Sequence, residues 1–235
     1  MSPLPFADED MHVHSTFSDG TGTLEQNLAA ATSRGLRRLT FVEHVRAGTD
    51  WAAAFVSAVR SVAESTSIEV RCGLEAKLLD LTGALDLPAD TGGADCVYIS
   101  DHRVPTADGP ADPATVRKLL VSGELDPDAV IADIIEATSN SLGLEQRAVI
   151  AHLFSVVPKL GLDESQVPLG AIERLAAVTA AAGARIEISE RWRCPSARTL
   201  SAFERHGVPI LLSTDSHIPA TIGRYEYCTS ILQQL

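Results

Sequence analysis

Seven short apolar runs alternate with longer helix-like segments along almost the whole chain. The runs, many of whose residues are β-branched, are 10–14, 37–42, 68–73, 95–100, 147–151, 184–188 and 208–213. The helix-like segments are 24–34, 51–65, 113–121, 127–140, 169–183 and 196–206. Because strands that alternate with helices of this length form parallel sheets through right-handed crossovers, the pattern predicts an α/β fold with a parallel sheet.

Seven parallel strands can form an open doubly wound sheet or a small closed barrel. No G-x-G-x-x-G or P-loop follows a predicted strand, so the usual nucleotide sites of open sheets are missing. Nearly every predicted strand instead ends in a side chain that can bind a metal. These side chains are His12, His14, Glu43, His44, Glu75, His102, His152, Glu187, Asp215 and His217. Because the carboxyl ends of barrel strands converge on one rim, this distribution favours a (β/α) barrel.

Length and composition are consistent with a single domain over residues 1–235, in which 45% hydrophobic residues supply the core. The formal net charge of −12 argues against a protein that holds extended nucleic acid on a basic face. The charge does not exclude anionic substrates, because bound divalent cations reverse the local field. The oligomeric state stays open.

Three features predict a soluble, cytoplasmic protein without a membrane partner. Asp8, Glu9 and Asp10 stand where a secretory signal would need positive charge followed by an apolar run. The alanine-rich uncharged run from Leu175 to Ala184 is half as long as a membrane span. The four cysteines form no C-x-x-C pair, which favours buried thiols in a reducing compartment over a disulfide framework.

The stretch MHVHSTFSDG, residues 11–20, has two histidines two positions apart. On a strand, His12 and His14 would point to the same face, where two imidazoles can bind one metal ion. An isolated H-x-H is weak support, and any one histidine could be an ordinary buried residue bonded to a backbone carbonyl. Six of the seven histidines, however, lie at predicted strand ends. Only His206, beside Gly207, has an ordinary explanation, as a cation at a helix C-terminus.

Burying so many ionisable groups on one rim without a counter-ion would be costly, and bound metal removes that cost. Histidine and carboxylate ligands without cysteine suit zinc, manganese or iron. Nine candidate ligands exceed what one ion needs, so we expect two to three divalent metal ions. The candidates are His12, His14, Asp19, His44, Glu75, His102, His152, Asp215 and His217.

Six motifs then point to one family. MHVHSTFSDG, FVEH, CGLEAKL, YISDH, VIAHLF and LLSTDSH occur in the order found in the polymerase-and-histidinol-phosphatase (PHP) superfamily, which the chain resembles from His12 to Tyr225. The resemblance implies a distorted (β/α)7 TIM-like barrel of the PHP type, a trinuclear metal site and cleavage of phosphoesters.

Carried over position by position, the resemblance implies three sets of ligands. His12, His14, Glu75 and Asp215 would hold one ion; Glu75 would bridge it to a second ion held by His102 and His152; Asp19, His44 and His217 would hold the third. Three positions depart from the usual motifs, and none removes a ligand. They are Glu43 in place of Asp, Asp101 in place of a small residue, and Leu153 in place of Pro.

The implied reaction is hydrolysis of a small phosphomonoester, such as histidinol phosphate or a nucleotide-like phosphate, by a metal-bridging hydroxide. The expected catalytic residues are Glu75, Asp215 and His217. The expected phosphate-binding residues are Arg103, Arg191, Arg193 and Arg224, of which Arg191 and Arg193 would lie on one face if R-W-R is extended. We expect the proline-rich loop 103–113 to lie over the site mouth as a lid, and residues 76–94 to form turns.

Two alternatives remain open. An amidohydrolase-type metal hydrolase also begins with H-x-H and ends with an aspartate, but it often adds a carbamylated lysine, and the nearest lysine here is Lys77. A non-catalytic PHP module would typically lose ligands, whereas all nine positions hold competent residues.

Overall fold

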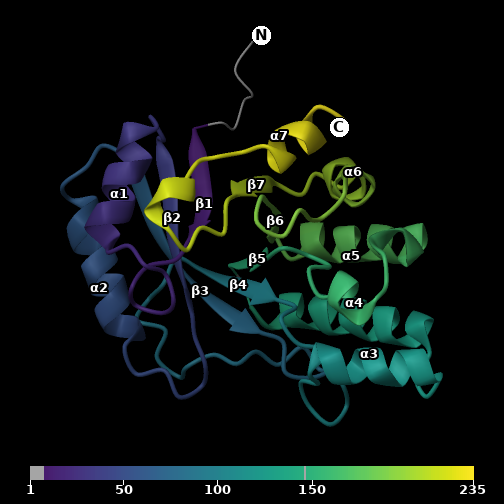
Figure 1. The fold of residues 1–235 in the computed structure, drawn as a ribbon. Helices are drawn as coiled ribbons and strands as arrows, with labels where there is room; N and C mark the ends of the chain where they lie inside the picture. The colour runs from purple at the N-terminus through teal and green to yellow at the C-terminus, as the bar shows by residue number, and fades with distance from the viewer. Residues whose placement is uncertain (1–7, 146) are drawn as a thin grey trace.

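The computed structural model describes residues 8–145 and 147–235. Within them, seven strands form one sheet in which each strand pairs in parallel with the next one along the chain. The strands are β1 (Glu9–Val13), β2 (Arg38–His44), β3 (Glu69–Lys77), β4 (Cys96–Ser100), β5 (Ala148–Ile150), β6 (Arg185–Ser189) and β7 (Ile210–Ser213). The last strand lies against the first, so the sheet is a nearly closed, distorted (β/α)7 barrel, and the predicted α/β barrel is confirmed (Figure 1).

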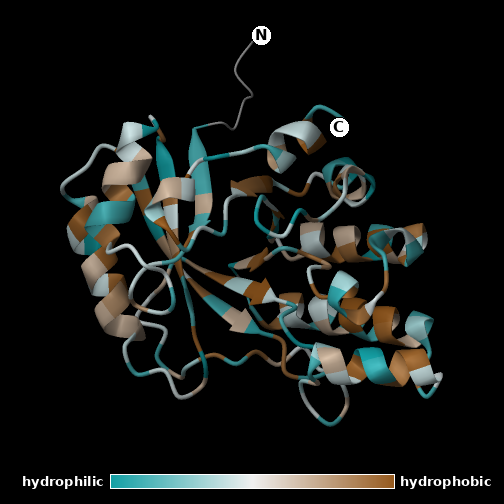
Figure 2. Ribbon diagram, viewed as in Figure 1, coloured by the Kyte–Doolittle hydropathy of each residue, from teal (hydrophilic) through white to brown (hydrophobic). Residues whose placement is uncertain are grey.

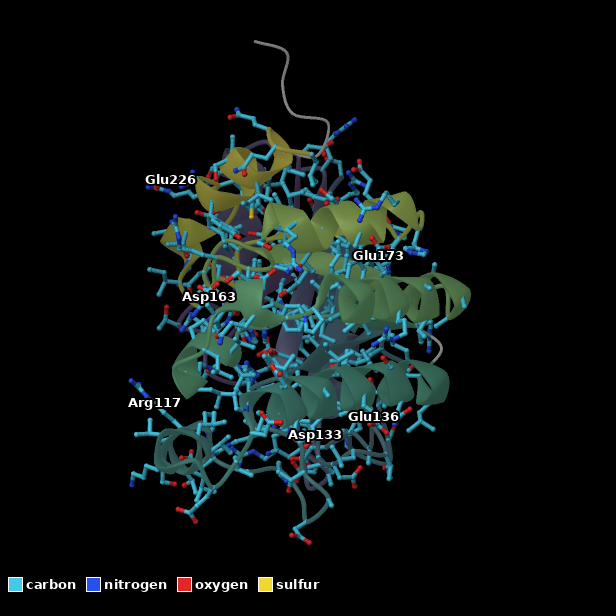
Figure 3. The ribbon with its side chains drawn as sticks, turned by 90° about the vertical axis from the view of Figure 1, so that its right-hand side faces the viewer. Arg117, Asp133, Glu136, Asp163, Glu173 and Glu226 are labelled. Atoms are coloured by element: carbon cyan, nitrogen blue, oxygen red, sulfur yellow. The ribbon has the colours of Figure 1, made fainter. Side chains whose placement is uncertain are left out.

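Helices cover the outside of the sheet. The α-helices are α1 (Leu24–Ser33), α2 (Ala52–Ala63), α3 (Pro113–Ser122), α4 (Pro127–Leu144), α5 (Leu169–Ala181), α6 (Ala197–Arg205) and α7 (Tyr227–Leu232). Figure 1 shows α1 and α2 on one side of the strands and α3 to α6 on the other. Hydrophobic segments occur on most strands in Figure 2, although β1 and β2 also carry hydrophilic stretches, and most strand residues are buried. Charged residues such as Glu136 and Glu173 lie on the outer side of the helices (Figure 3).

Helix boundaries follow local capping chemistry. Thr23 accepts a hydrogen bond from the Gln26 amide and its own amide is bonded by the Gln26 side chain, which makes a capping box at the start of α1. Asp112 caps α3 in front of Pro113, and Asp126 caps α4 in front of a proline at its first position. The β3–β4 connection, by contrast, has no helix among its described residues and consists mostly of turns, as the sequence predicts.

Carboxylate side chains complete the junction between β1 and β7. The Leu212 amide donates to Glu9 Oε1 over 3.0 Å, and the Thr214 amide donates to Asp10 Oδ1 over 2.9 Å. The Gly223 amide donates to Asp10 Oδ2 over 2.9 Å, and both carboxylates are buried. These acidic residues therefore supply acceptors where the two strands lack a regular backbone ladder.

A shift in the register of β1 turns two successive side chains inward. The pairing of β1 with β2 slips by one residue between Asp10 and Val13, as in a β-bulge. Met11 lies in an inner cluster that includes Tyr98, and the His12 ring lies 4.8 Å from the Tyr98 ring. Val13 instead packs in the cluster under α1 and α2. The bulge therefore allows His12 to face the barrel interior.

Several boundaries differ from the sequence-based prediction, and the difference at β3 bears on the site. β3 runs to Lys77, beyond the predicted 68–73, because Leu74 and Ala76 pack outward under the helices while Glu75 points inward. The charged residues Glu75 and Lys77 obscure this alternation of inward and outward side chains in the sequence. The helix α7 is also additional to the predicted helices.

Of the remaining predictions, some are confirmed and others stay open. All four cysteines are unpaired and buried, as expected. Among the described residues no helix combines the length and the apolar character that a membrane crossing requires. The single-domain assignment over 1–235 stays a prediction, and its residues 1–7 and 146 lie outside the described part of the chain.

The β1–β7 junction generates a stability prediction. Asp10→Ala leaves the amides of Thr214 and Gly223 without their acceptor, at about 1–3 kcal/mol for each unsatisfied buried group. We expect the free energy of unfolding in urea to fall by about 3 kcal/mol, whereas Glu136→Ala, on an exposed helix face, changes it by about 0.5 kcal/mol or less. A loss no larger than that of the control would contradict this role for Asp10.

Candidate metal centre

The nine predicted ligands gather at the carboxyl ends of the strands. His12, His44 and Glu75 lie on β1, β2 and β3, and His14 directly follows β1. His102 and His152 each lie two residues beyond a strand, and Asp215 and His217 follow β7. Asp19 comes from the loop after β1 and lies 3.3 Å from His217. Residues separated by two hundred positions therefore share one rim.

The Glu75 carboxylate is the centre of this group. It is 2% exposed, and its oxygens lie within 3.5 Å of five imidazoles. The distances are 2.8 Å to His44 Nδ1, 2.9 Å to His152 Nε2, 3.4 Å to His12 Nε2, 3.4 Å to His102 Nε2 and 3.5 Å to His14 Nε2. A carboxylate that contacts imidazoles from four different strand ends has the position that a bridging ligand requires.

His12, His14 and Asp215 form the most buried donor set. His14 Nε2 lies 3.0 Å from His12 Nε2 and 3.1 Å from Asp215 Oδ1. Ligands that sit about 2.0–2.1 Å from a tetrahedral ion are separated by roughly 3.3 Å. The spacing of these three donors therefore suits one divalent cation.

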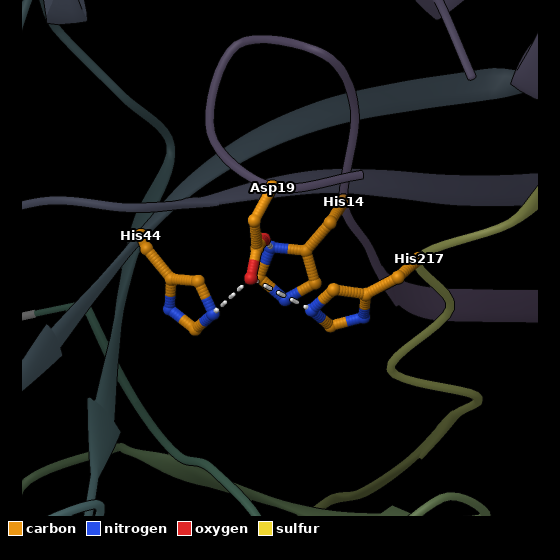
Figure 4. A group of neighbouring side chains, drawn as sticks. All are labelled: His14, Asp19, His44 and His217. Atoms are coloured by element: carbon orange, nitrogen blue, oxygen red, sulfur yellow. Dashed lines mark ion pairs between the residues drawn. The ribbon is translucent and has the colours of Figure 1, made fainter. Parts of the chain in front are cut away.

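A second donor set contains Asp19, His14, His44 and His217 (Figure 4). Asp19 Oδ2 lies 3.3 Å from His217 Nε2 and 3.6 Å from His44 Nε2. His14 Nδ1 lies 3.7 Å from Asp19 Oδ1, so this ring faces both sets. The resemblance places His14 in the first set alone, and the structure adds its second nitrogen to the surroundings of Asp19.

A third donor set consists of His44, Glu75 and His102. His152 lies beside it, because its ring stacks on His102 with 4.9 Å between the ring centroids and its Nε2 reaches Glu75. The three sets contain eight of the nine predicted ligands, and His152, the ninth, contacts them through Glu75.

Buried atoms without partners test whether these residues fit metal ions. Among the described residues, four buried side-chain atoms lack a hydrogen-bond partner, and all four belong to the site. They are His14 Nδ1, Glu75 Oε2, His152 Nδ1 and Asp215 Oδ1. Buried polar atoms are otherwise satisfied in proteins, so the donor set fits divalent cations.

Two further carboxylates orient the imidazoles. Glu187 Oε2 lies 2.9 Å from His12 Nδ1, and its other oxygen accepts the His152 backbone N–H over 2.7 Å. Asp101 Oδ1 lies 3.4 Å from His152 Nδ1. Such contacts fix the tautomer and ring orientation of a ligating histidine. Glu187 was visible in the sequence as a strand-end acid, and the role of Asp101 follows from the fold.

Glu43 positions the loop that carries Asp19. Its Oε1 accepts hydrogen bonds from the backbone N–H and the hydroxyl of Ser15, at 2.8 and 2.5 Å, and Ser18 also donates to this carboxylate. Gly20 allows the loop to return against β1, because a Cβ there would lie 2.6 Å from the His14 carbonyl carbon. The departure from the usual motif at Glu43 thus preserves a structural contact.

Two ligands have strained backbones. His152 has a φ of 27° and Asp215 a φ of 50°, in the left-handed region that non-glycine residues seldom adopt. Each such residue costs about 1–3 kcal/mol and is typical of functional sites. The strain aims both side chains into the centre.

Trp192 is a site residue that sequence reasoning missed. Its Nε1 donates to Asp215 Oδ2 over 2.5 Å, which leaves Oδ1 facing His12 and His14. Its ring lies 5.6 Å from the His152 ring. The motif R-W-R drew attention to its arginines, although the tryptophan between them makes the contact.

The four arginines occupy different surroundings. Arg191 and Arg224 line a cavity of about 520 Å³ together with Asp215 and His217, and Arg191 NH1 lies 2.7 Å from His217 Nδ1. Residues 190–193 form a turn, so R-W-R is not extended and the condition under which Arg191 and Arg193 would share one face is not met. Arg193 has a φ of 53° and lies over the Tyr227 ring, at 5.1 Å from its centroid.

Arg103 begins the loop that was expected to act as a lid. The loop folds as a small hairpin in which the amides of Val104 and Ala111 exchange hydrogen bonds with each other's carbonyls. Arg103 pairs with Asp112 over 2.6 Å and lines a cavity that also contains His44, Glu75 and His102. The loop therefore borders the site, and its function as a lid stays a prediction.

The histidines and carboxylates of the site have pKa values that are shifted in different directions. Burial lowers the pKa of His14 and of His102 to about 4. Burial also acts to lower the pKa of His152, but Asp101 and Glu75 raise it to about 10, and Glu187, Asp215 and Glu75 raise the pKa of His12 in the same way. The adjacent imidazoles lower the pKa of Glu75 and Asp215, against the effect of burial.

Residues 10–118 match the PHP domain family model. A segment of 73 residues is 41% identical to phosphoribosyl 1,2-cyclic phosphate 1,2-diphosphodiesterase of Eggerthella lenta, which covers 31% of this chain and 25% of that protein. The chain thus spans a quarter of the length of this curated relative.

Two solved structures show the same fold. Histidinol phosphate phosphatase of Lactococcus lactis, complexed with zinc, L-histidinol and phosphate, matches with a TM-score of 0.69 at 18% identity, over 97% of this chain and 94% of that one. A chain in a structure of archaeal ribonuclease P with mature tRNA matches with a TM-score of 0.51 at 13% identity, over 96% and 82% of the chains.

The hydrogen bond from Trp192 to Asp215 generates one prediction. Trp192→Phe keeps an aromatic ring but removes the donor, so Asp215 loses its orientation and zinc affinity falls about tenfold or more. Competition with a chromogenic chelator measures this change, and Trp51→Phe serves as the control. Equal affinities in the two variants would show that the bond does not orient Asp215.

The charge states generate a second prediction. His12 and His152 carry protons at pH 7 in the metal-free protein, because their pKa values are raised, whereas His14 and His102 are already neutral. Zinc binding at pH 7 therefore releases about two protons, and apparent affinity increases as pH rises toward the His152 pKa of about 10. Calorimetry in buffers of different ionisation enthalpy counts the protons. A binding enthalpy independent of the buffer would refute the assignment.

Proposed function

We propose that the chain, whose residues 10–118 match the PHP domain family model, is a metal-dependent phosphoesterase of the PHP superfamily that hydrolyses a small phosphomonoester. The observation that carries this proposal is the meeting of nine candidate nitrogen and oxygen ligands, with the buried Glu75 at their centre and with four buried atoms that have no hydrogen-bond partner. Such an arrangement is suited to cations and to the phosphate oxygens that cations bind.

We assign two to three divalent ions to the site. The three donor sets, which share His14 and His44, support three positions with Glu75 between them. Zinc is the first candidate, since histidine and carboxylate ligands suit it and the Lactococcus phosphatase is a zinc complex. Manganese and iron suit the same ligands.

When bound, these ions supply Lewis acidity and lower the pKa of a coordinated water so that it can act as a nucleophile near neutral pH. Glu75 and Asp215, which are buried, would bind the ions from the interior side of the barrel. Arg191 and Arg224 lie on the open side, in the cavity next to Asp215 and His217, where guanidinium groups can neutralise phosphate oxygens. His217 would face a metal ion through Nε2, beside Asp19, while its Nδ1, 2.7 Å from Arg191 NH1, would keep that arginine next to the ion.

The substrate is proposed to be a small phosphorylated molecule. Histidinol phosphate phosphatase and the phosphoribosyl cyclic phosphodiesterase both act, by their names, on such molecules. The net charge of −12 is unfavourable for extended nucleic acid. A cytoplasmic location is consistent with four unpaired, buried cysteines.

The two alternative functions lack support from the site. Lys77, the nearest lysine for a carbamylated ligand, has its Nζ 2.8 Å from Asp86 Oδ2. All nine ligand positions come together, which a module without catalytic function would not need. Hydrolysis is therefore the proposed activity.

We expect the zinc- or manganese-loaded protein to hydrolyse 4-nitrophenyl phosphate and to leave a matched 4-nitroanilide intact. Glu75→Gln removes the central charge, so kcat/KM falls about a hundredfold or more and bound metal, measured by elemental analysis, decreases. Glu136→Gln, on the outer face of α4, is the control. A metal-loaded wild type that cleaves the anilide but not the phosphoester would overturn the proposal.

A further inference from the structure

A third cavity, of about 800 Å³, opens beside His102 between α3 and the 3₁₀ helix Val157–Leu160. Its lining carries four basic side chains, Arg103, Arg117, Lys118 and Lys159, and one acidic one, Asp112. This accumulation of positive charge stands out in a chain whose formal net charge is −12. A local basic cavity in an acidic protein is a feature that selects anions.

Three of the four cations are available to a ligand. Arg103 pairs with Asp112 over 2.6 Å, and the other Asp112 oxygen accepts the amides of Ala114 and Thr115 at the start of α3. Arg117, Lys118 and Lys159 have no ion-pair partner anywhere in residues 8–145 and 147–235. Figure 3 shows Arg117 extending beyond the ribbon.

The cavity adjoins the metal centre, because His102 and Arg103 also line the cavity that contains Glu75. His102, in its wall, lies 3.4 Å from Glu75. Lys159 Nζ lies 4.1 Å from the centre of the Trp192 ring, whose N–H is bonded to Asp215. The cations come from the segments that follow His102 and His152, so two strand-end ligands are each followed by part of this basic wall.

The geometry points to a second anion-binding site for the substrate. We infer that the preferred substrates carry two phosphate groups: the scissile ester at the metal centre and a second phosphate held by Arg117, Lys118 and Lys159. Val121, 82% exposed, and Pro113 give the same cavity an apolar wall against which a carbon skeleton between the phosphates can lie. This inference rests on the proposed phosphoesterase function and specifies its substrate class.

The test compares matched substrates in the metal-loaded protein. Linear alkanediol bisphosphates of increasing chain length are assayed beside the alkyl monophosphates of the same length, by release of inorganic phosphate. We expect kcat/KM to favour the bisphosphate by about tenfold or more at the optimal length, because the second phosphate adds charge-assisted hydrogen bonds to the basic side chains. Equal kcat/KM values at every length would overturn the inference.

Variants then identify the side chains that cause the preference for bisphosphates. Arg117→Gln combined with Lys118→Gln is expected to reduce the bisphosphate-to-monophosphate ratio toward one, and Lys159→Met is expected to act in the same direction. Arg174→Gln, on α5 and away from all three cavities at the strand ends, should leave the ratio as in the wild type. A preference that survives the double variant would assign the second phosphate elsewhere and contradict the inference.

Binding provides a readout without turnover. An alkane bisphosphonate, which is not hydrolysed, should bind the metal-loaded wild type about tenfold or more tightly than the monophosphonate, and the double variant should lose this difference. The outcomes separate the two proposals. Absence of phosphoester cleavage with any substrate refutes the proposed function, whereas cleavage of monophosphates and bisphosphates at equal rates refutes the second site alone.

Discussion

One buried carboxylate, that of Glu75, organises this molecule. Five imidazoles approach it within 3.5 Å from four different strand ends, in a region from which water is largely excluded. Uncompensated charges in such a region are strongly unfavourable. The negative charge of the buried carboxylates is therefore compensated either by protons on the histidines or by bound metal ions. The raised pKa values of His12 and His152 reflect compensation by protons.

The barrel provides this geometry at the cost of local irregularity. The bulge in β1 turns His12 inward, and the left-handed backbones of His152 and Asp215 aim their side chains at the same centre. The junction of β1 and β7 is completed by the carboxylates of Glu9 and Asp10. Irregular backbone at the rim and polar contacts at the junction are thus two consequences of bringing distant ligands together.

Charge is distributed to suit an anionic substrate. The protein is acidic as a whole, yet cations line two cavities beside the ligands: Arg191 and Arg224 near Asp215, and Arg117, Lys118 and Lys159 near His102. Fields focused in a cleft act on a ligand more strongly than the net charge does. The local arrangement, with metal ions added, therefore outweighs the net charge in deciding what can bind.

The sequence by itself determined the strand–helix alternation and the barrel, and it predicted the nine candidate ligands. These depend on periodicity and on polar residues at strand ends, which are local properties that any reader of the chain can find. The tertiary structure decided the rest. R-W-R turns instead of extending, so Arg193 packs on Tyr227 while Trp192 reaches Asp215. Asp10 bonds β1 to the segment after β7, and Lys159 and Arg117 line the same cavity. Such contacts join side chains far apart in the chain, and no local pattern records which of them will meet.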